Sequence, residues 1–521
     1  MYTPDQPYLS QRSPVAGSNI VATSQPLAAQ AGLQAMRRGG NAVDAALAAA
    51  ITLTVVEPNN NGVGSDAFCI LWDGNELVGL NASGRSPAAW DLERFAGRDK
   101  MPGLGWDTIT VPGCVSAWVT LSDRYGNLPF DDLFDDAVRY ARDGFQVGPK
   151  SAYYWQMLAS VYERFDEFQR HFLPAPNAGQ RVVRQELATT LEEIASSHGE
   201  SFYRGNLAAQ IAAASKEAGG ALTLDDLAAH EADWVTPTKQ EYGEVALHEI
   251  PPNGQGLAAQ IALGILAHLP KQDVDSPEWV HQQVEAMKVA IGAAFEHFAD
   301  PRAMRVNVAD LLEPGMLQRM AEQIGPRASS IPPVSLPVGE DTVYLTTADE
   351  NGMMVSFIQS NYLAFGSGIV IPGTGIAMQN RGCGFVLDPD HPNVVAGGKR
   401  PFHTIIPGFV TQDGAPVLSF GVMGGHMQHQ GHVQMVSRIF DHGQNPQAAS
   451  DAPRWHVTEN YELLLEHGFD EATLSALSAM GHQVRFEATE SIFGGAQLIQ
   501  KIGDGYVAGS DHRKEGHAVA Y

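Results

Sequence analysis

The feature that most constrains the fold is a sudden change of pattern at the Asp341–Thr342 junction. Apolar residues between positions 129 and 299 recur mainly at helical spacing. Residues 326–341 then hold four prolines and three serines with almost no apolar periodicity, which predicts an exposed linker. Residues 342–360 alternate apolar and polar side chains around a turn at 349–352, which predicts two strands. Helices before the junction and strands after it together predict a layered α/β or α+β core.

Further helices and strands are predicted on both sides of this junction. The first helix is expected over residues 25–50, with Ser24 as its cap and an interruption at Gly39–Gly40. Other helices are predicted at Leu133–Arg142, Glu186–Ser196, Leu207–Glu217, Leu257–Leu269, Trp279–Phe298, His432–Phe440 and Asp470–Met480. Other strands are predicted in a hairpin at Phe68–Ala82, at Gly368–Gln379, at His403–Thr411 and in a closing pair near Ser491–Gly509.

Composition excludes several classes of protein. The 521 residues include 33 Lys+Arg and 59 Asp+Glu, for a net charge of −26, which disfavours nucleic acid and anionic membranes as partners. The three cysteines lie far apart, which excludes a disulfide framework and a zinc knuckle. The N-terminus shows no signal-peptide pattern, and the longest apolar stretch, residues 45–56, is too short to span a bilayer. We therefore expect a cytoplasmic protein.

Thr342 has the chemistry of a self-sufficient nucleophile. If the bond after Asp341 is cut, Thr342 carries both a hydroxyl and a free α-amine with a reference pKa of about 8. The amine can then act as the base for the hydroxyl, so that no separate histidine or aspartate is needed. The alternative is an ordinary boundary between a loop and a strand. A second Asp-Thr pair, Asp107–Thr108, precedes only a short predicted strand and shows how little the dipeptide means alone.

Motifs on both sides of the junction resemble those of the γ-glutamyltranspeptidase family. The segment TVYLTTADENGMMVSFIQSNYLAFGSGIVIPGTGIAMQNRG, which begins at Thr342, resembles that family's small subunit. So do KRPFHTIIP (399–407) and GVMGGHMQHQGH (421–432). Upstream, GGNAVDAALAAAITLTVVEPNNNGVGSDAF (39–68) resembles the family's N-terminal signature. RYARDGFQV (139–147) and GSDHRKEG (509–516) also fit.

This resemblance implies an N-terminal nucleophile hydrolase with a four-layer αββα sandwich. The precursor would cut itself between Asp341 and Thr342 into a large subunit, residues 1–341, and a small subunit, residues 342–521. Both fragments would build the sandwich jointly and stay associated. Thr342 would then be the nucleophile of self-cleavage and of acyl transfer.

The resemblance also assigns residues around the nucleophile. Gly424 and Gly425 match the family's glycine pair, whose backbone amides form the oxyanion hole, and two glycines let the backbone approach one point closely. Ser360 falls where the family places a threonine that hydrogen-bonds the nucleophile. Asn361 lies close to the position of a substrate-binding asparagine.

The sequence departs from the transpeptidases where those enzymes bind the α-carboxylate and α-amine of glutamate. Ser83 stands at the position of the carboxylate-binding arginine, with Arg85 two residues on, and His403–Thr404 replaces a Ser-Ser pair. The position of the amine-binding acidic residue falls within residues 382–384, and a neighbouring glutamine is replaced by Arg381. These departures resemble the branch of the family that includes acylases and amidohydrolases. Arg85, Arg381, His403 and Thr404 are therefore the remaining candidates for substrate binding.

We expect a self-processing amide hydrolase or acyltransferase that works through an acyl-Thr342 intermediate. Water or an amine would accept the acyl group, and no cofactor is required. The substrate would be a small amide with a γ-glutamyl or related acyl group. The alternative acyl group is a small acid, such as glutaryl, with an anionic end and no α-amine. A rival of another class is an unprocessed homologue that binds a metabolite.

A run of three histidines suggests a further rival, a metal-dependent hydrolase. His426, His429 and His432 are spaced by three residues, which can place imidazoles on one helical face. The run contains no carboxylate, and the glycines at 424, 425 and 431 weaken a helix there. We therefore favour histidines that line a pocket or cap the helix, and we predict no metal site.

Overall fold

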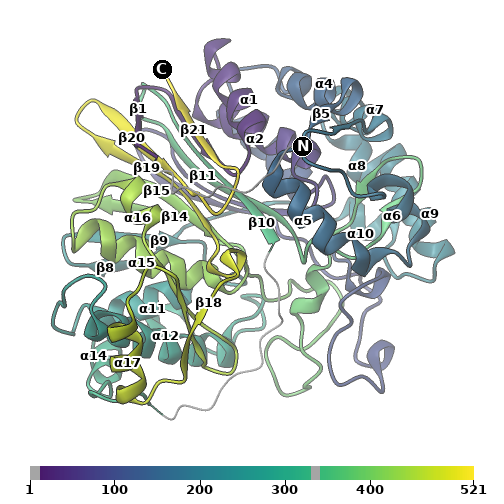
Figure 1. Cartoon of the computed structure of the whole chain (residues 1–521). Helices are drawn as coiled ribbons and strands as arrows, with labels where there is room; N and C mark the ends of the chain where they lie inside the picture. Colours follow the sequence, from purple (N-terminus) through teal and green to yellow (C-terminus); the bar gives the residue numbers. More distant parts are fainter. Residues whose placement is uncertain (1–11, 330–340) are drawn as a thin grey trace.

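Two antiparallel sheets pack face to face at the centre of the molecule, and helices cover their outer faces (Figure 1). The computed structural model describes residues 12–329 and 341–521. One seven-stranded sheet runs in the order β1 (Val15–Gly17), β20 (Gly505–Ser510), β19 (Gly495–Ile502), β15 (Ala415–Met423), β14 (Gly408–Gln412), β9 (Val245–Glu249) and β8 (Thr238–Tyr242). The other runs in the order β21 (His517–Ala520), β2 (Ile20–Thr23), β10 (Asp341–Ala348), β11 (Met354–Tyr362), β3 (Asp66–Trp72), β4 (Leu77–Asn81) and β7 (Asp233–Val235).

Helices from the first part of the chain lie on the side of the β10 sheet, and later ones on the side of the β15 sheet. The first group comprises α1 (Pro26–Arg37), α2 (Ala42–Val56), α3 (Cys114–Tyr125), α4 (Asp135–Asp143), α5 (Pro149–Ala159), α6 (Asp166–Phe172), α7 (Gln185–Ser196), α8 (Glu200–Arg204), α9 (Asn206–Glu217) and α10 (Leu224–Ala228). The second comprises α11 (Gly256–Leu266), α12 (Pro277–His297), α13 (Val308–Leu311), α14 (Pro314–Ala321), α15 (Met427–Phe440), α16 (Pro446–Asp451) and α17 (Glu471–Met480). Short sheets pair β5 (Phe145–Gln146) with β6 (Arg181–Val182), β12 (Val370–Ile371) with β13 (Ile376–Ala377), and β16 (Trp455–Val457) with β17 (Leu463–Glu466) and β18 (Val484–Glu487).

Three apolar cores hold these layers together. One lies between the sheets and includes Phe68, Tyr344 and Phe409. The other two join each sheet to its covering helices. The predicted four-layer αββα sandwich is therefore confirmed. None of the helices in residues 12–329 and 341–521 is long and apolar enough to cross a membrane.

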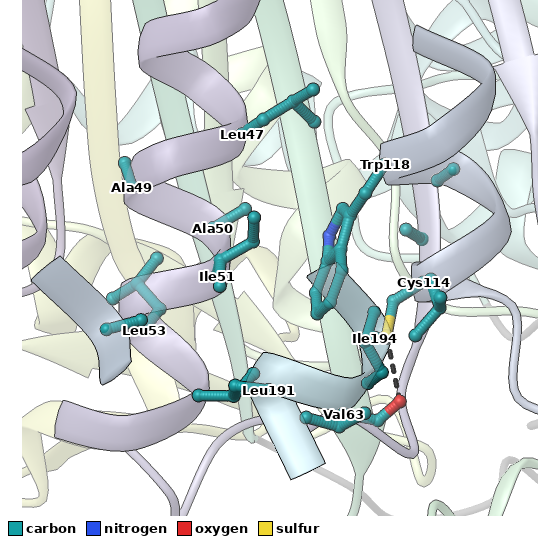
Figure 2. Packing of buried hydrophobic residues seen from close by; sticks show 14 of the residues in the cluster. Leu47, Ala49, Ala50, Ile51, Leu53, Val63, Cys114, Trp118, Leu191 and Ile194 are labelled. Atoms are coloured by element: carbon teal, nitrogen blue, oxygen red, sulfur yellow. Dashed lines mark hydrogen bonds between the residues drawn. The ribbon is translucent and has the colours of Figure 1, made fainter. Parts of the chain in front are cut away.

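The core behind β11 is dense (Figure 2), and a polar link reaches the strand from it. Every residue of α2 is buried, and Leu47, Ile51 and other side chains of this helix pack with Trp118 of α3. The Trp118 indole donates a hydrogen bond to Gln359 Oε1 at 3.2 Å. Gln359 in turn donates to Ala50 O at 2.8 Å. Since β11 is fixed in this way from behind, its next residues have little freedom to move.

Each of the two large sheets contains strands from both sides of the junction. In one sheet β10 lies between β2 and β11, and β11 lies between β10 and β3. In the other, β14 lies between β9 and β15. Neither half of the chain can therefore complete a sheet alone. Of the predicted linker, residues 330–340 lie outside the described residues, and Arg327 and Ser329 are exposed.

Most predicted helices and strands are present, with shifted ends. The hairpin forms β3 and β4, the two strands after the junction form β10 and β11, and the closing pair forms β19 and β20. The first helix is interrupted at Gly39–Gly40 as predicted, and Gly39 has a φ of 96° that favours glycine. Its cap is Gln25 rather than Ser24, because Gln25 Oε1 accepts from two helix amides while the Ser24 hydroxyl donates to Glu57 at 2.6 Å.

Three predictions about strands and helices after residue 360 are wrong in extent, and one strand was missed. Gly368–Gln379 is a tight hairpin of two short strands, because glycines with positive φ at 373 and 375 turn the chain. In the segment His403–Thr411 the strand begins only at Gly408, after Pro407, which cannot donate to a ladder. The helix expected at His432–Phe440 begins already at Met427. Strand β15 was not predicted at all, although it forms the centre of its sheet.

Candidate active site

Thr342 is buried near the start of β10, where the ladder with β11 is irregular. The register shifts between Asp341 and Val343, so that two residues of β11, Ser360 and Asn361, lie opposite Thr342. A bulge of this kind re-aims the side chains beside it and is common next to active sites. The irregularity therefore brings two of the predicted site residues to the predicted nucleophile.

The Thr342 hydroxyl lies between two polar side chains. It donates a hydrogen bond to Ser360 Oγ at 3.2 Å and accepts one from Gln428 Nε2 at 3.4 Å. Ser360 Oγ also accepts from the Tyr362 amide at 2.8 Å. Tyr362 itself has a φ of 81°, which is strained for a residue with a bulky side chain. Backbone strain of this kind persists only where the surrounding structure enforces it, here directly beside Thr342.

Gly424 and Gly425 connect the end of β15 to the start of α15. Their φ values are 121° and 54°, both in the region that favours glycine. Neither amide donates a hydrogen bond to another residue that the structure describes. Helix α15 begins at Met427, and a helix N-terminus favours negative charge. The two N–H groups are thus free to bind an anionic oxygen.

Arg381 is a buried cation with unused hydrogen-bonding capacity. Its guanidinium lies 4.1 Å from the centre of the Tyr362 ring and donates from Nη1 to Thr404 Oγ1 at 2.8 Å. Within the described part of the chain, Nε and Nη2 are buried and have no hydrogen-bond partner. Burial lowers the pKa of Arg381 to about 10, so the side chain stays charged at neutral pH. A buried charge with two free donors is costly unless a ligand completes it.

His403 binds Asp66 rather than an open site. Its Nε2 lies 3.2 Å from Asp66 Oδ2, and both side chains are buried. Asp66 Oδ1 also accepts from the amides of Gly84 and Gly113, both at 3.1 Å. Burial raises the pKa of Asp66 to about 7, and burial also keeps the pKa of His403 well below its usual value. This pair joins β3 to the loop that carries Thr404.

Asn361 and Arg85 differ in whether they are available to bind a substrate. Asn361 accepts from the Ser65 hydroxyl at 2.9 Å, while its Nδ2 is buried without a partner in the described residues, so it can still donate to a ligand. Arg85 instead forms an ion pair with Asp300 at 3.0 Å and lies 3.8 Å from Asp233. Because carboxylates already neutralise its charge, we retain Asn361 and no longer propose Arg85 as a substrate-binding residue.

The three histidines of the run do not converge on one point. His429 Nδ1 bonds Gln255 Oε1 at 2.9 Å, His432 Nδ1 bonds Glu249 at 2.6 Å, and His426 precedes the first residue of α15. In the described residues the group compact enough for a metal ion is instead His281, Glu285 and His482, within 4.8 Å of one another. There Lys288 already pairs with Glu285 at 2.8 Å, so a cation is present without a metal.

Two glutamines at the site were missed by the sequence analysis. Gln428 reaches the nucleophile, as described above. Gln255 donates to Thr404 O at 2.5 Å and to Gly425 O at 2.8 Å, and so ties the glycine pair to the loop that contacts Arg381. Neither glutamine belongs to a sequence motif that would mark it as a site residue. The one available signal for Gln428 was its position three residues after the glycine pair.

The sandwich and its junction together define the class of protein. A four-layer αββα core with a buried hydroxyl at the start of a central strand is the architecture of the N-terminal nucleophile amide hydrolases.

The chain belongs to the γ-glutamyltranspeptidase family, whose model matches residues 28–521. It is 35% identical to the glutathione hydrolase-like YwrD proenzyme of Bacillus subtilis, over 98% of this chain and 99% of that one. It is 36% identical to the oxamate amidohydrolase proenzyme of Klebsiella pneumoniae, over 95% and 97% of the two chains. The crystal structure of cephalosporin acylase from Bacillus halodurans matches with a TM-score of 0.96 and 44% identity, covering 100% of this chain and 99% of that one. The protein is therefore a self-processing amide hydrolase of this family.

Proposed function

We propose that the protein hydrolyses amides of small carboxylic acids whose acyl group ends in a second carboxylate and lacks an α-amine. The chain first cuts itself between Asp341 and Thr342, which yields fragments of 341 and 180 residues. The observation that carries the substrate assignment is the buried Arg381 guanidinium, with Nε and Nη2 unpartnered among the described residues.

The reaction follows from the groups around Thr342. Thr342 Oγ attacks the amide carbonyl, and the α-amine freed by self-cleavage takes the hydroxyl proton. The amides of Gly424 and Gly425 bind the oxygen on which negative charge develops. The protonated α-amine then gives its proton to the leaving amine. Water adds to the resulting ester by the reverse roles, which releases the acid and restores Thr342, and no cofactor takes part.

Arg381 supplies the specificity in this account. A guanidinium binds a carboxylate through two parallel N–H groups, and Nε with Nη2 forms such a pair. Thr404 and the Tyr362 ring hold the group from its other sides. Asn361 Nδ2 is a further donor for the substrate. An acyl group with an anionic end would therefore satisfy donors that are otherwise buried without partners.

A γ-glutamyl group is the competing substrate, and it lacks a partner for its ammonium. Asp66 is the carboxylate found among the candidate residues, and it is already bound by His403 and two backbone amides. Its pKa, raised to about 7 by burial, also weakens it as a partner for a cation. Glutaryl amides and oxamate both have a carboxylate and no α-amine, so they represent the proposed class. The relatives named as an acylase and an oxamate amidohydrolase support this choice.

A panel of p-nitroanilides that differ only in the acyl group tests the proposal. We expect a higher kcat/KM for glutaryl than for γ-glutamyl or butyryl p-nitroanilide. Replacement Arg381→Met should lower kcat/KM for the glutaryl compound about 100-fold, because a buried charge-assisted hydrogen bond is lost, and should leave butyryl turnover nearly unchanged.

Arg184 offers a matched control for Arg381. It is also buried, lies 4.5 Å from the Phe172 ring and has a pKa lowered by burial to about 10. It bonds Gly375 O rather than residues around Thr342. Arg184→Met should therefore leave the order of substrates unchanged. Faster γ-glutamyl than glutaryl turnover by the wild type, or an equal loss for all acyl groups in Arg381→Met, would overturn the assignment.

A further inference from the structure

Gln428 is fully buried and occupies a position on α15 from which it can act on the nucleophile. Its two amide atoms have different partners. Oε1 accepts from the Ile406 amide at 3.0 Å, which fixes the orientation of the side chain, and Nε2 donates to Thr342 Oγ at 3.4 Å. The amide cannot be turned over without placing its NH₂ group against the Ile406 N–H. The donor side is therefore held toward Thr342.

The other buried glutamines of α15 show what a purely structural glutamine does in this helix. Gln430 and Gln434 each bond a backbone amide and a backbone carbonyl of β16, at Val457 and Trp455. Both thereby pin a short edge strand to the helix. Gln428 lies two residues nearer the glycine pair than Gln430 does, and it uses its donor on a side-chain hydroxyl instead.

Thr342 Oγ takes part in one hydrogen bond as donor and in another as acceptor. A hydroxyl oxygen carries a carbon, a hydrogen and two lone pairs. Here the hydrogen points to Ser360 Oγ, and one lone pair accepts from Gln428 Nε2. These two contacts together orient the hydroxyl. When the proton leaves, the Gln428 N–H also faces the negative charge that develops on Oγ.

We propose that Gln428 is a catalytic residue that aims the Thr342 hydroxyl and stabilises charge on it, both in self-cleavage and in turnover. The inference rests on the proposed role of Thr342 and adds a residue to it. It predicts that a hydrogen-bond donor at this position is required. An acceptor there would oppose the reaction, because it repels the developing negative charge.

Two variants of Gln428 test this requirement. Gln428→Met keeps the length but removes the donor, and it should lower kcat and the rate of self-cleavage about 10- to 100-fold with little change in KM. Gln428→Glu should be still slower at pH 8. As the pH falls, the new carboxyl group becomes protonated and can both accept from Ile406 and donate to Thr342. The ratio of its kcat to that of the wild type should therefore rise several-fold from pH 8 to pH 5.5.

Gln434→Met and Gln434→Glu are the matched controls on the same helix. Their melting temperatures report the structural effect of losing a buried glutamine. A structural role for Gln428 would give activity ratios that follow the melting temperatures and do not depend on pH, as for Gln434, and that result overturns the inference. If Gln428→Glu does not fold, the kcat of Gln428→Met relative to that of Gln434→Met decides between the two: a catalytic role predicts a value about 10- to 100-fold lower, and equal kcat values overturn the inference.

The Thr342→Ala variant keeps this test separate from that of the proposed function. If cleavage and turnover persist in Thr342→Ala, Thr342 is not the nucleophile, and both proposals are overturned. If Thr342→Ala is not cleaved but the Gln428 variants behave like the Gln434 controls, only the proposed role of Gln428 is overturned.

Discussion

Several residues that contact one another around the junction are far apart in the sequence. Thr342 meets Ser360 within one hairpin, but Gln428 comes from 86 residues away and Asn361 reaches Ser65 across 296 residues. Motif resemblance predicted Thr342, Ser360 and the glycine pair as site residues. It could not predict that Arg85 would be paired with Asp300, since nothing in the local sequence brings those two side chains together.

The glycine pair gives a prediction at the scale of one residue. A Cβ at Gly424 would lie 2.9 Å from Gly494 Cα, and the φ of 121° is unfavourable for any other residue. Gly424→Ala must therefore shift the two amides that we propose as the oxyanion hole. We expect kcat to fall about 100-fold or more, as for loss of an oxyanion-hole donor. Steady-state kinetics on the folded variant measures this.

Gly443, just after the other end of α15, is the control for this substitution. It also has a positive φ, 64°, but a Cβ there would meet nothing within 4 Å. Gly443→Ala should destabilise the protein by about 1 kcal/mol and leave kcat near that of the wild type. Equal kcat values for the two variants would show that the Gly424 amide does not take part in the reaction.

At the scale of helices and strands, the sequence was most informative where a pattern was local. The helix interruption at Gly39–Gly40 and the hairpin of β10 and β11 follow from glycines, turn residues and alternation within a few positions. Strand β15 escaped prediction because it is buried on both faces, so that it lacks the alternation of a half-exposed strand. Helix α15 began earlier than predicted because its first turn, which carries Gln428, is buried and packs at the site.

The C-terminal end of α2 gives a prediction about pH. Glu57 is the buried residue that ends this helix, and Ser24 and Asn60 donate hydrogen bonds to its carboxylate. Burial raises the pKa of Glu57 to about 7. Between the usual value of 4.5 and about 7, the folded protein keeps a proton that the unfolded chain has lost. The free energy of unfolding should therefore fall as the pH rises through this window, by up to roughly 3 kcal/mol.

Glu57→Gln should remove this dependence, because a neutral amide can serve both partners at every pH. The melting temperature of the wild type should fall between pH 5 and pH 8 by more than that of the variant. Glu217→Gln, at the exposed end of α9, should behave like the wild type. Parallel curves for wild type and Glu57→Gln would mean that Glu57 is ionised throughout this range.

At the scale of the whole molecule, the two proposed fragments are interleaved rather than adjacent. Strand β10 pairs with β2 on one side and β11 on the other, and β3 pairs with β11. Cutting the chain before Thr342 therefore breaks one peptide bond and leaves the ladders of both sheets in place. The sequence predicted the junction and the family. Which strands of the two parts become neighbours depends on contacts between distant residues, which periodicity does not encode.

The N-terminal sequence of the smaller fragment is the most direct test of the account. Purified wild-type protein should give two bands on a denaturing gel that elute together under native conditions. The smaller band, of 180 residues, should begin with Thr342. Thr342→Ala should give one band of 521 residues and no amide hydrolysis. An intact wild-type chain that hydrolyses amides at full rate, or a small fragment that begins at another residue, would contradict the central claim.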